Sequence, residues 1–400
     1  MKRVDVLVAG GGPAGSTLAA LAAEAGARVV LVERQAFPRD KVCGEFVSVE
    51  GRGVLERLGV LESLIEAGAT EMDGIRLSTL GGHRLDAPLP DVPGVGRAAL
   101  GISRQVLDTT LFRRAGRAGA ECLDRVEVVS PVIEDGLVRG MRLRAVGSSG
   151  PVEETRAAVT VAADGRRSIL VRALHPSIGD PVRSGPRSWF GMKCHIEADP
   201  ARLERRVELH LFDGGYAGLG GVEGGRINVC LMVTVRALRA HGGSPDRLLR
   251  ERILRNPAIA EVLARAERSS AWKSIGPLRF GVRLPAAAGA LFVGDAAGTI
   301  DPYSGEGMAH ALRGAELASR FALRAASEGG LSSASASEYA AAWMKAFAPA
   351  TRRVRRLGRL LEHRWAGEAA GGLLATVGGR LLPSLVAATR TGSAAVAHVE

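Results

Sequence analysis

Three glycines near the start of the chain, Gly10, Gly12 and Gly15, have the spacing of a phosphate-binding turn. The run VDVLVAG at 4–10 predicts a buried strand, and the Ala/Leu-rich residues after it predict a helix. Gly10 permits the tight turn, Gly12 lets the backbone approach a pyrophosphate, and Gly15 lets the helix pack closely on the strand. Because the free N–H groups at the start of that helix attract phosphate, the sequence predicts a dinucleotide site here.

Glu33 ends the next predicted strand, RVVLVER at 28–34. A carboxylate in this place accepts hydrogen bonds from a ribose and repels a 2′-phosphate. The site is therefore predicted to prefer FAD or NAD over NADP.

A second glycine-rich stretch, VGDAAGTIDPYSGEGMAHAL at 293–312, precedes another predicted helix. Asp295 at a strand end can bind the ribityl chain of a flavin. Pro302 and the run Gly305-Glu306-Gly307 would carry the backbone under the flavin ring. A helix that begins near Gly307 would point its positive end at the ring and favour negative charge on reduced flavin.

These two motifs, with Asp164-Gly165 between them, resemble those of the FAD-dependent oxidoreductases that include aromatic hydroxylases, geranylgeranyl reductases and flavin halogenases. The resemblance covers roughly residues 1–330. It implies an α/β fold: a glutathione-reductase-type Rossmann FAD domain, an inserted antiparallel-sheet substrate domain and a helical C-terminal segment. The expected FAD domain comprises 1–74, 98–170 and 281–327, the substrate domain 75–97 and 171–280, and the C-terminal helices 328–400.

The resemblance also implies site residues. Arg104 in GISRQVLD matches an arginine that contacts the FAD chain, and FPRDKVCGE at 37–45 resembles a segment that runs beside the flavin, which places Cys43 near the ring. The positions expected to contact the cofactor are Gly10, Gly12, Pro13, Ala14, Gly15, Glu33, Arg34, Lys41, Cys43, Gly44, Arg104, Asp164, Gly165, Gly294, Asp295, Pro302, Gly305, Glu306, Gly307 and Met308.

Cys43, Tyr303 and His210 are the candidate catalytic residues. Tyr303 lies in the glycine-rich stretch at 293–312, which is expected to contact the flavin. His210 and His195 could donate protons in the pocket, but they are also compatible with a structural role in the sheet. Geranylgeranyl reductases carry a Y-x-W-x-F-P run where this chain reads YAGLGGVEG, so Tyr216 is kept and the other aromatics are absent. The W-x-W-x-I-P motif of halogenases is absent, and WKSIGPL at 272–278 is only a partial match. No metal site is expected.

The remaining pattern predicts the elements that position these residues. We expect helices at 53–68, 104–120, about 245–267 and about 306–326, a hairpin at 75–89, three strands between 121 and 163, and an antiparallel sheet over 186–235.

The chain has 400 residues, a net charge of +11 and 46% hydrophobic residues, typical of a globular protein. Its arginines are scattered without interleaved aromatics, which argues against nucleic acid as a partner. The four cysteines form no C-x-x-C pair and suggest no disulfide framework, which is typical of a protein in a reducing cytoplasm. The basic amphipathic stretch at 343–365 is compatible with peripheral membrane contact or with a helix packed on the FAD domain. The oligomeric state is not predicted.

Several functions agree with these residues. The first is an NAD(P)H-dependent monooxygenase of secondary metabolism, which hydroxylates a hydrophobic phenolic or polyketide-like molecule. NADPH or NADH would bind transiently, because no second strand–G-x-G-x-x-G–helix unit exists. The alternatives are a reductase of a polyprenyl or lipid C=C bond, a flavin halogenase, and a non-catalytic flavin or electron-transfer subunit.

Overall fold

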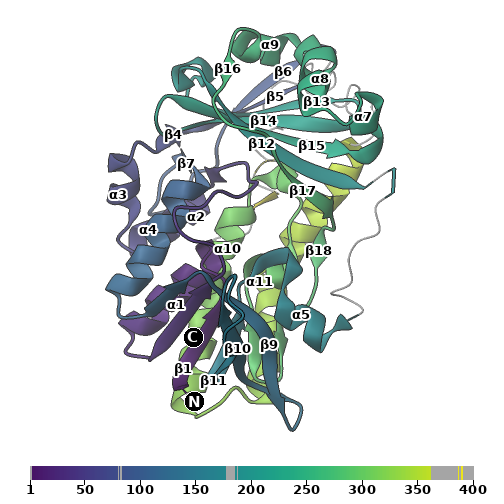
Figure 1. The fold of residues 1–400 in the computed structure, drawn as a ribbon. Helices are drawn as coiled ribbons and strands as arrows, with labels where there is room; N and C mark the ends of the chain where they lie inside the picture. Colours follow the sequence, from purple (N-terminus) through teal and green to yellow (C-terminus); the bar gives the residue numbers. More distant parts are fainter. Residues whose placement is uncertain are drawn as a thin grey trace.

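The computed structural model describes residues 2–79, 83–176 and 188–361, together with residues 81, 185, 186, 386, 389 and 390. Two large sheets form separate layers of the described chain (Figure 1). The lower layer in that view carries the N-terminal glycine turn, and the upper layer is the antiparallel sheet.

The first sheet is built on parallel strands in the order β20-β11-β1-β2-β8. These strands are β1 (Lys2–Ala9), β2 (Val29–Glu33), β8 (Glu121–Asp124), β11 (Glu153–Ala162) and β20 (Ala290–Phe292). Antiparallel neighbours complete the sheet: β9 (Val126–Glu134), β10 (Leu137–Ala145) and β19 (Ala286–Ala287). The central strands are Val/Leu-rich because helices cover the sheet, as is usual for parallel strands.

Three helices position the first sheet's loops: α1 (Pro13–Glu24), α4 (Arg104–Arg117) and α10 (Gly307–Ser327). Helix α1 packs against both α4 and α10. The N-terminal ends of α1 and α10 therefore belong to one packed unit, although nearly three hundred residues separate them in the sequence.

The second sheet has the strand order β16-β12-β15-β14-β13-β5-β6, with β17 paired to β12. Its strands are β5 (Gly74–Ser78), β6 (Arg84–Pro88), β12 (Trp189–Glu197), β13 (Arg206–Phe212), β14 (Gly215–Val222), β15 (Arg226–Thr234), β16 (Glu267–Arg268) and β17 (Lys273–Leu278). One face packs on α8 (Pro245–Glu251) and α9 (Pro257–Leu263), through a core that includes Val229, Leu248 and Ile259. The opposite face turns toward the first sheet's half of the molecule (Figure 1).

Shorter elements connect the layers. The strands are β3 (Phe46–Val47), β4 (Thr70–Met72), β7 (Ala99–Gly101), β18 (Gly281–Val282) and β21 (Gly298–Thr299). The helices are α2 (Val49–Arg57), α3 (Leu61–Glu66), α5 (Ile169–Leu174), α7 (Val235–Ala240) and α11 (Ser333–Leu361). Short 3-10 turns are η1 (Gly165–Arg167), η2 (Pro200–Leu203), η3 (Ile253–Arg255), η4 (Gly294–Ala296) and η5 (Pro302–Ser304).

The structure confirms the expected α/β class with a mostly antiparallel sheet, in which β5 and β13 pair in parallel, inserted between the first and last parallel strands of the first sheet. The exact domain boundaries stay predictions. The C-terminal segment 328–400 is helical over α11, and most of the segment beyond residue 361 lies outside the described residues.

Several predicted elements are divided in the structure. The helix expected at 53–68 is two helices, α2 and α3, separated at Gly59, whose φ is 65°. The helix expected at 245–267 is likewise split before Pro257 into α8, η3 and α9. Four strands occupy 121–163 where three were expected, because Arg125, with φ of 56°, separates β8 from β9. Each error lies at a left-handed residue or at a proline.

Candidate active site

The first glycine turn joins β1 to α1 and depends on close backbone packing. A Cβ atom on Gly10 would lie 2.4 Å from the Ala163 carbonyl oxygen, and one on Gly15 would lie 1.9 Å from the Gly10 carbonyl oxygen. Side chains at these two positions would separate the helix from the strands. The assigned packing roles of Gly10 and Gly15 therefore agree with the geometry.

Gly12 faces open space instead. A Cβ atom there would have only two neighbours within 4 Å, the guanidinium Nη2 atoms of Arg39 at 3.6 Å and Arg104 at 3.8 Å. Gly12 is also the N-cap of α1, with Pro13 next and no side chain capping the helix. The backbone N–H groups of Ala14 and Gly15 therefore remain for an anion, and two cations lie beside them. This arrangement fits a pyrophosphate.

Glu33 holds the end of β2 in a defined position. Its carboxylate accepts hydrogen bonds from the backbone N–H of Gly11 at 3.0 Å and of Gln35 at 3.1 Å. Arg39 pairs with the same carboxylate at 3.3 Å. The carboxylate is thus oriented beside the glycine turn, where a ribose is expected. Its neighbour Arg34 is exposed.

A buried carboxylate, Asp108, organises the arginines of this site. It accepts two hydrogen bonds of 2.8 Å from Arg104, one turn earlier on α4, and lies 2.9 Å from Arg39 Nη1. Burial alone would lower the pKa of Arg104, but the charge and hydrogen bonds of Asp108, together with Cys43, outweigh this and raise the pKa overall. Lys41 lies close enough for repulsion by Arg39, although burial is the main cause of its lowered pKa. Sequence reasoning missed Arg39 and Asp108, although the i,i+4 spacing of Arg104 and Asp108 was a usable signal.

The second glycine-rich loop follows β20. Asp295 in η4 is exposed. The protein atoms around its carboxyl nevertheless limit its hydration and raise its pKa. Arg166 and Arg283 oppose this rise through their charges. Arg283 lies before β19, and it donates its backbone N–H to the Ala297 carbonyl oxygen at 2.9 Å and its guanidinium to the Arg166 carbonyl oxygen at 2.6 Å, which links this loop to the Asp164-Gly165 turn.

The loop then leads into α10 through Pro302 and Gly305. Gly305 has φ of 66°, Glu306 is the N-cap, and no side chain caps the helix. A Cβ atom on Gly307 would meet nothing within 4 Å. The first N–H groups of α10, including that of Met308, are therefore available beside open space, as expected for a helix that faces a flavin ring.

Two predicted cofactor contacts have internal partners. Asp164 accepts from the backbone N–H of Ile169 at 2.9 Å and so fixes the start of α5. Glu306 is buried and forms an ion pair with Arg390, and its charge helps raise the pKa of Glu50, chiefly raised by burial. Both carboxylates therefore bind other groups of the protein and help to position the elements around the expected flavin site.

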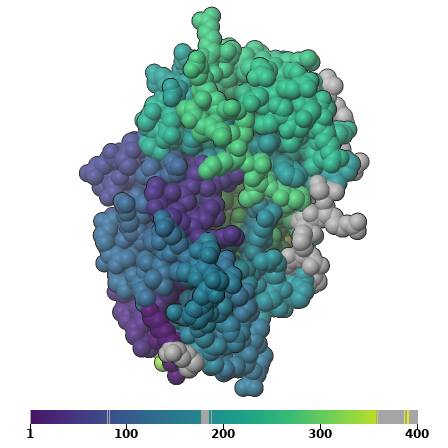
Figure 2. Space-filling view, in the orientation of Figure 1, coloured from purple at the N-terminus to yellow at the C-terminus, as the bar shows by residue number. Residues whose placement is uncertain are grey.

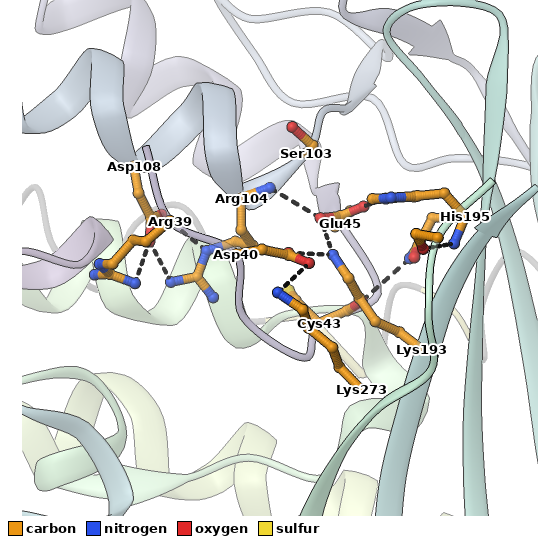
Figure 3. Close-up of polar contacts among 12 residues, drawn as sticks. Arg39, Asp40, Cys43, Glu45, Ser103, Arg104, Asp108, Lys193, His195 and Lys273 are labelled. Carbon is orange, nitrogen blue, oxygen red and sulfur yellow. Dashed lines mark hydrogen bonds and ion pairs between the residues drawn. The ribbon is translucent and has the colours of Figure 1, made fainter. Parts of the chain in front are cut away.

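The KVCGE segment connects the two halves of the molecule (Figure 3). Glu45 is 1% exposed, has φ of 54°, and its Oε2 lies 2.6 Å from His195 Nε2 on β12. The other carboxylate oxygen, Oε1, accepts from the Arg104 backbone N–H at 2.9 Å and from Lys193. The Cys43 carbonyl oxygen accepts from Asn228 on β15 at 3.1 Å. The segment is therefore tied directly to the antiparallel sheet.

Lys193 extends this network toward solvent. It lies 2.6 Å from Asp40, which pairs at 3.0 Å with the half-exposed Lys273 of β17 (Figure 3). Burial lowers the pKa of Lys193, but the carboxylates of Glu45 and Asp40 raise it overall, so its ammonium stays charged. No local pattern predicts these pairings, because Lys193 lies about 150 residues from both Asp40 and Glu45.

A cavity lies between this segment and the sheet. Gly218 and Cys230 are register partners in the middle of the sheet, and both are partly exposed. Cys43 is also partly exposed and Gly44 is exposed. Exposure at the centre of a sheet face that another layer covers requires a hollow, and Figure 2 shows a recess where the purple N-terminal segment meets the green layer.

The wall beside this cavity is apolar. Leu211, Tyr216 and Met232 of the sheet form one cluster, against which Leu209 and Tyr303 pack. The rings of Tyr216 and Tyr303 lie 4.3 Å apart. The structure thus brings Tyr303 and the Cys43 segment to the same face of the sheet.

His210 does not reach this face. Its Nδ1 lies 2.7 Å from Ser78 Oγ, and its Nε2 lies 2.9 Å from Glu208. Ser78 also accepts from Asn256, the N-cap of α9, so these groups occupy the helix-covered face. Side chains alternate along β13, and Leu209 and Leu211 face the cavity instead. The expectation that His210 lines the pocket is therefore corrected.

The comparisons with known proteins agree with this site. The FAD binding domain family matches residues 3–345. The chain belongs to this family. It is thus an FAD-dependent oxidoreductase, and the prediction of this wider family from its motifs is confirmed.

Named members span several activities. The chain is 31% identical over 346 residues to digeranylgeranylglycerophospholipid reductase 2 of Methanopyrus kandleri, covering 86% of this chain and 83% of that protein. It is 39% identical over 167 residues to 6-methylpretetramide 4-monooxygenase of Streptomyces rimosus, covering 42% of this chain and 39% of that protein. The flavin-dependent brominase Bmp2 shares the fold, with a TM-score of 0.79 at 17% identity over 99% of this chain and 96% of that one.

None of the helices in the described residues has the length and apolar run needed to cross a bilayer.

Proposed function

We propose that this protein reduces a C=C bond in a long apolar, polyprenyl-like substrate. The observation that carries the proposal is the position of Cys43, which is partly exposed in a flavin-side segment bound to the apolar face of the antiparallel sheet. A relative of reductase name, aligned over most of both chains, supports this choice over the other activities of the family.

FAD, when bound, supplies the hydride for such a reduction. The second carbon of the double bond needs a proton, and the Cys43 S–H is placed to donate it. The Arg104 guanidinium lies beside Cys43, which contributes to its raised pKa, and the sulfur would regain its proton from solvent. The apolar wall of Leu209, Leu211 and Met232 would hold the chain and exclude water.

The residues that would hold FAD are those already described. Gly12 and the start of α1 face the pyrophosphate, Glu33 the ribose, Asp295 the ribityl chain, and the start of α10 the ring. NADPH or NADH would reduce the flavin in a transient complex, because the chain carries a single dinucleotide fingerprint.

An anaerobic experiment tests the reduction. The holoenzyme is reduced with dithionite and mixed with geranylgeranyl phospholipid, while flavin absorbance near 450 nm and product mass are followed. We expect flavin reoxidation without oxygen and a gain of two hydrogens per reduced bond. Cys43→Ala should slow reoxidation at least tenfold with unchanged FAD content, whereas Cys122→Ala, distant in the first sheet, should not. Absence of reoxidation by any polyprenyl compound would exclude the proposal.

Oxygen transfer is the second candidate, favoured by the 39% identity to the Streptomyces monooxygenase. In oxygenated buffer, a hydroxylated product from a phenolic or polyketide-like compound, with no anaerobic reoxidation, would establish that activity instead. A halogenated product that requires added halide would point to the halogenase alternative.

A further inference from the structure

We propose that Arg390, near the end of the chain, is a positioning residue that acts on the flavin through Glu306. By neutralising that carboxylate it preserves the positive end of α10 and raises the reduction potential of the flavin. The inference rests on the proposed placement of the flavin ring at the start of α10. It goes beyond the proposed function, because it applies to any reaction that the reduced flavin performs.

Glu306 places a carboxylate at the end of α10 where the helix carries its positive charge. It is the N-cap residue of α10, and its side chain is completely buried. Its backbone carbonyl oxygen accepts from the N–H of His310 at 2.8 Å, which fixes it to the first turn. An unbalanced negative charge at this position would oppose the helix dipole and disfavour added electrons on the ring.

Arg390 provides the balancing charge from a distant part of the chain. Its guanidinium forms an ion pair with Glu306 Oε1, and the same Nη1 atom lies 4.0 Å from Glu50 Oε2. Arg390 is 7% exposed, so water screens these charges weakly. A buried pair of this kind affects its surroundings more strongly than an exposed pair would.

Contacts outside the ion pair hold Arg390 in position. Its carbonyl oxygen accepts from Arg353 of α11 at 3.4 Å. Four residues earlier, Val386 is buried in a cluster with Leu85 and Ala87 of β6. This short stretch of chain therefore contacts both the antiparallel sheet and the helices of the first sheet's half.

Other charged groups face the same pair. Burial is the main cause of the raised pKa of Glu50, on α2; the Glu306 charge adds to the rise and Arg390 opposes it. On α10, burial lowers the pKa of His310 and of Arg313, and the Glu306 charge opposes both shifts. Arg390 contacts Glu306 directly but approaches Glu50 only to 4.0 Å, so its removal should affect mainly Glu306.

The expected effect is on the equilibrium between oxidised and reduced flavin. Reduced flavin carries more negative charge, which the first N–H groups of α10 would stabilise. A neutral pair behind these groups leaves their effect intact. Without Arg390, the Glu306 carboxylate would lie behind them unbalanced and would make reduction less favourable.

Reduction potentials of the holoenzyme test the proposal without any substrate. They are measured against a reference dye during slow anaerobic reduction by xanthine oxidase. Arg390→Met should lower the equilibrium constant for two-electron reduction at least tenfold, which is about 30 mV. Arg390→Lys keeps the charge and should recover most of this loss.

A second substitution separates an electrostatic effect from a structural one. Adding Glu306→Gln to Arg390→Met removes both charges, so the equilibrium constant should return to within about threefold of the wild-type value. The loss in Arg390→Met alone should also shrink as pH is lowered from 9 to 6, because a buried carboxylate without its cation takes up a proton. Damage to the loop would show neither behaviour.

Arg352→Met is the matched control, because Arg352 is exposed on α11 and its loss changes the net charge equally. It should leave the potential unchanged. The proposal is overturned if Arg390→Met changes the equilibrium constant less than about threefold, if Glu306→Gln does not reverse the loss, or if Arg352→Met causes the same loss.

Melting temperature and FAD content are measured for each variant. If Arg390→Met lowers either, Arg390→Gln replaces it, and the same tenfold loss and reversal are required. Because no substrate is present, a failure to reduce C=C bonds leaves this measurement intact.

Discussion

The Glu45 carboxylate lies 2.6 Å from Nε2 of His195, across 150 residues of sequence. This contact and the ion pair with Lys193 attach the flavin-side segment to the antiparallel sheet. A charge this deeply buried is tolerated because cations and backbone N–H groups surround it. Glu45 therefore joins the flavin-side segment to the antiparallel sheet through two side chains of β12.

Glu45→Gln should lower the free energy of unfolding by about 3 kcal/mol, because the change leaves Lys193 buried with one carboxylate fewer. Urea unfolding of the holoenzyme measures this. Glu261→Gln is the control, since its ion pair with Arg84 is largely exposed and should cost less than about 1 kcal/mol. Equal effects of both changes would show that the Glu45 network does not join the layers.

The glycine turn predicts opposite behaviour for two neighbouring positions. Gly15→Ala should destabilise the cofactor-free protein by about 2 kcal/mol or more, because its Cβ would overlap the Gly10 carbonyl oxygen. Gly12→Ala should cost the cofactor-free protein less than about 1 kcal/mol and weaken FAD binding at least tenfold. Thermal unfolding and FAD titration separate the two effects. Normal FAD affinity in Gly12→Ala would contradict the pyrophosphate assignment.

Asp295→Ala should lose FAD on purification, because the hydrogen bonds to the ribityl chain would be missing. The ratio of flavin to protein absorbance after dialysis measures this. Asp213→Ala, in an exposed turn of the antiparallel sheet, provides the control and should retain the cofactor. Full occupancy in both variants would refute the placement of the loop.

His310 predicts an acid-dependent loss of stability. Burial lowers the pKa of its imidazole to about 4, beneath Phe347, whose ring lies 4.4 Å away. Below pH about 6.5 the unfolded chain binds a proton that the folded protein does not bind until about pH 4. The free energy of unfolding should therefore fall by about 3 kcal/mol as pH drops through this window.

His310→Phe should remove this part of the pH dependence while keeping an aromatic ring against Phe347. Urea unfolding at several pH values between 4 and 7 provides the comparison. An unchanged slope in the variant would mean that other groups cause the acid sensitivity.

The local parts of the site could be predicted from the sequence. The strand, glycine turn and helix at the N-terminus follow from residues within about twenty positions of one another, and so does the loop before α10. Glycine spacing and hydrophobic periodicity act over this range, and both motifs lie where they were expected.

Only the tertiary structure decided how the site is closed. The sequence singled out His210 as catalytic, but the alternation along β13 directs it to the helix-covered face, where Ser78 and Glu208 bind it. The Glu45 network was invisible because no local pattern records which distant strand a buried charge will meet. Local propensity fixes the elements, but the partners of buried charges and the shape of a cavity depend on contacts between residues far apart in the chain.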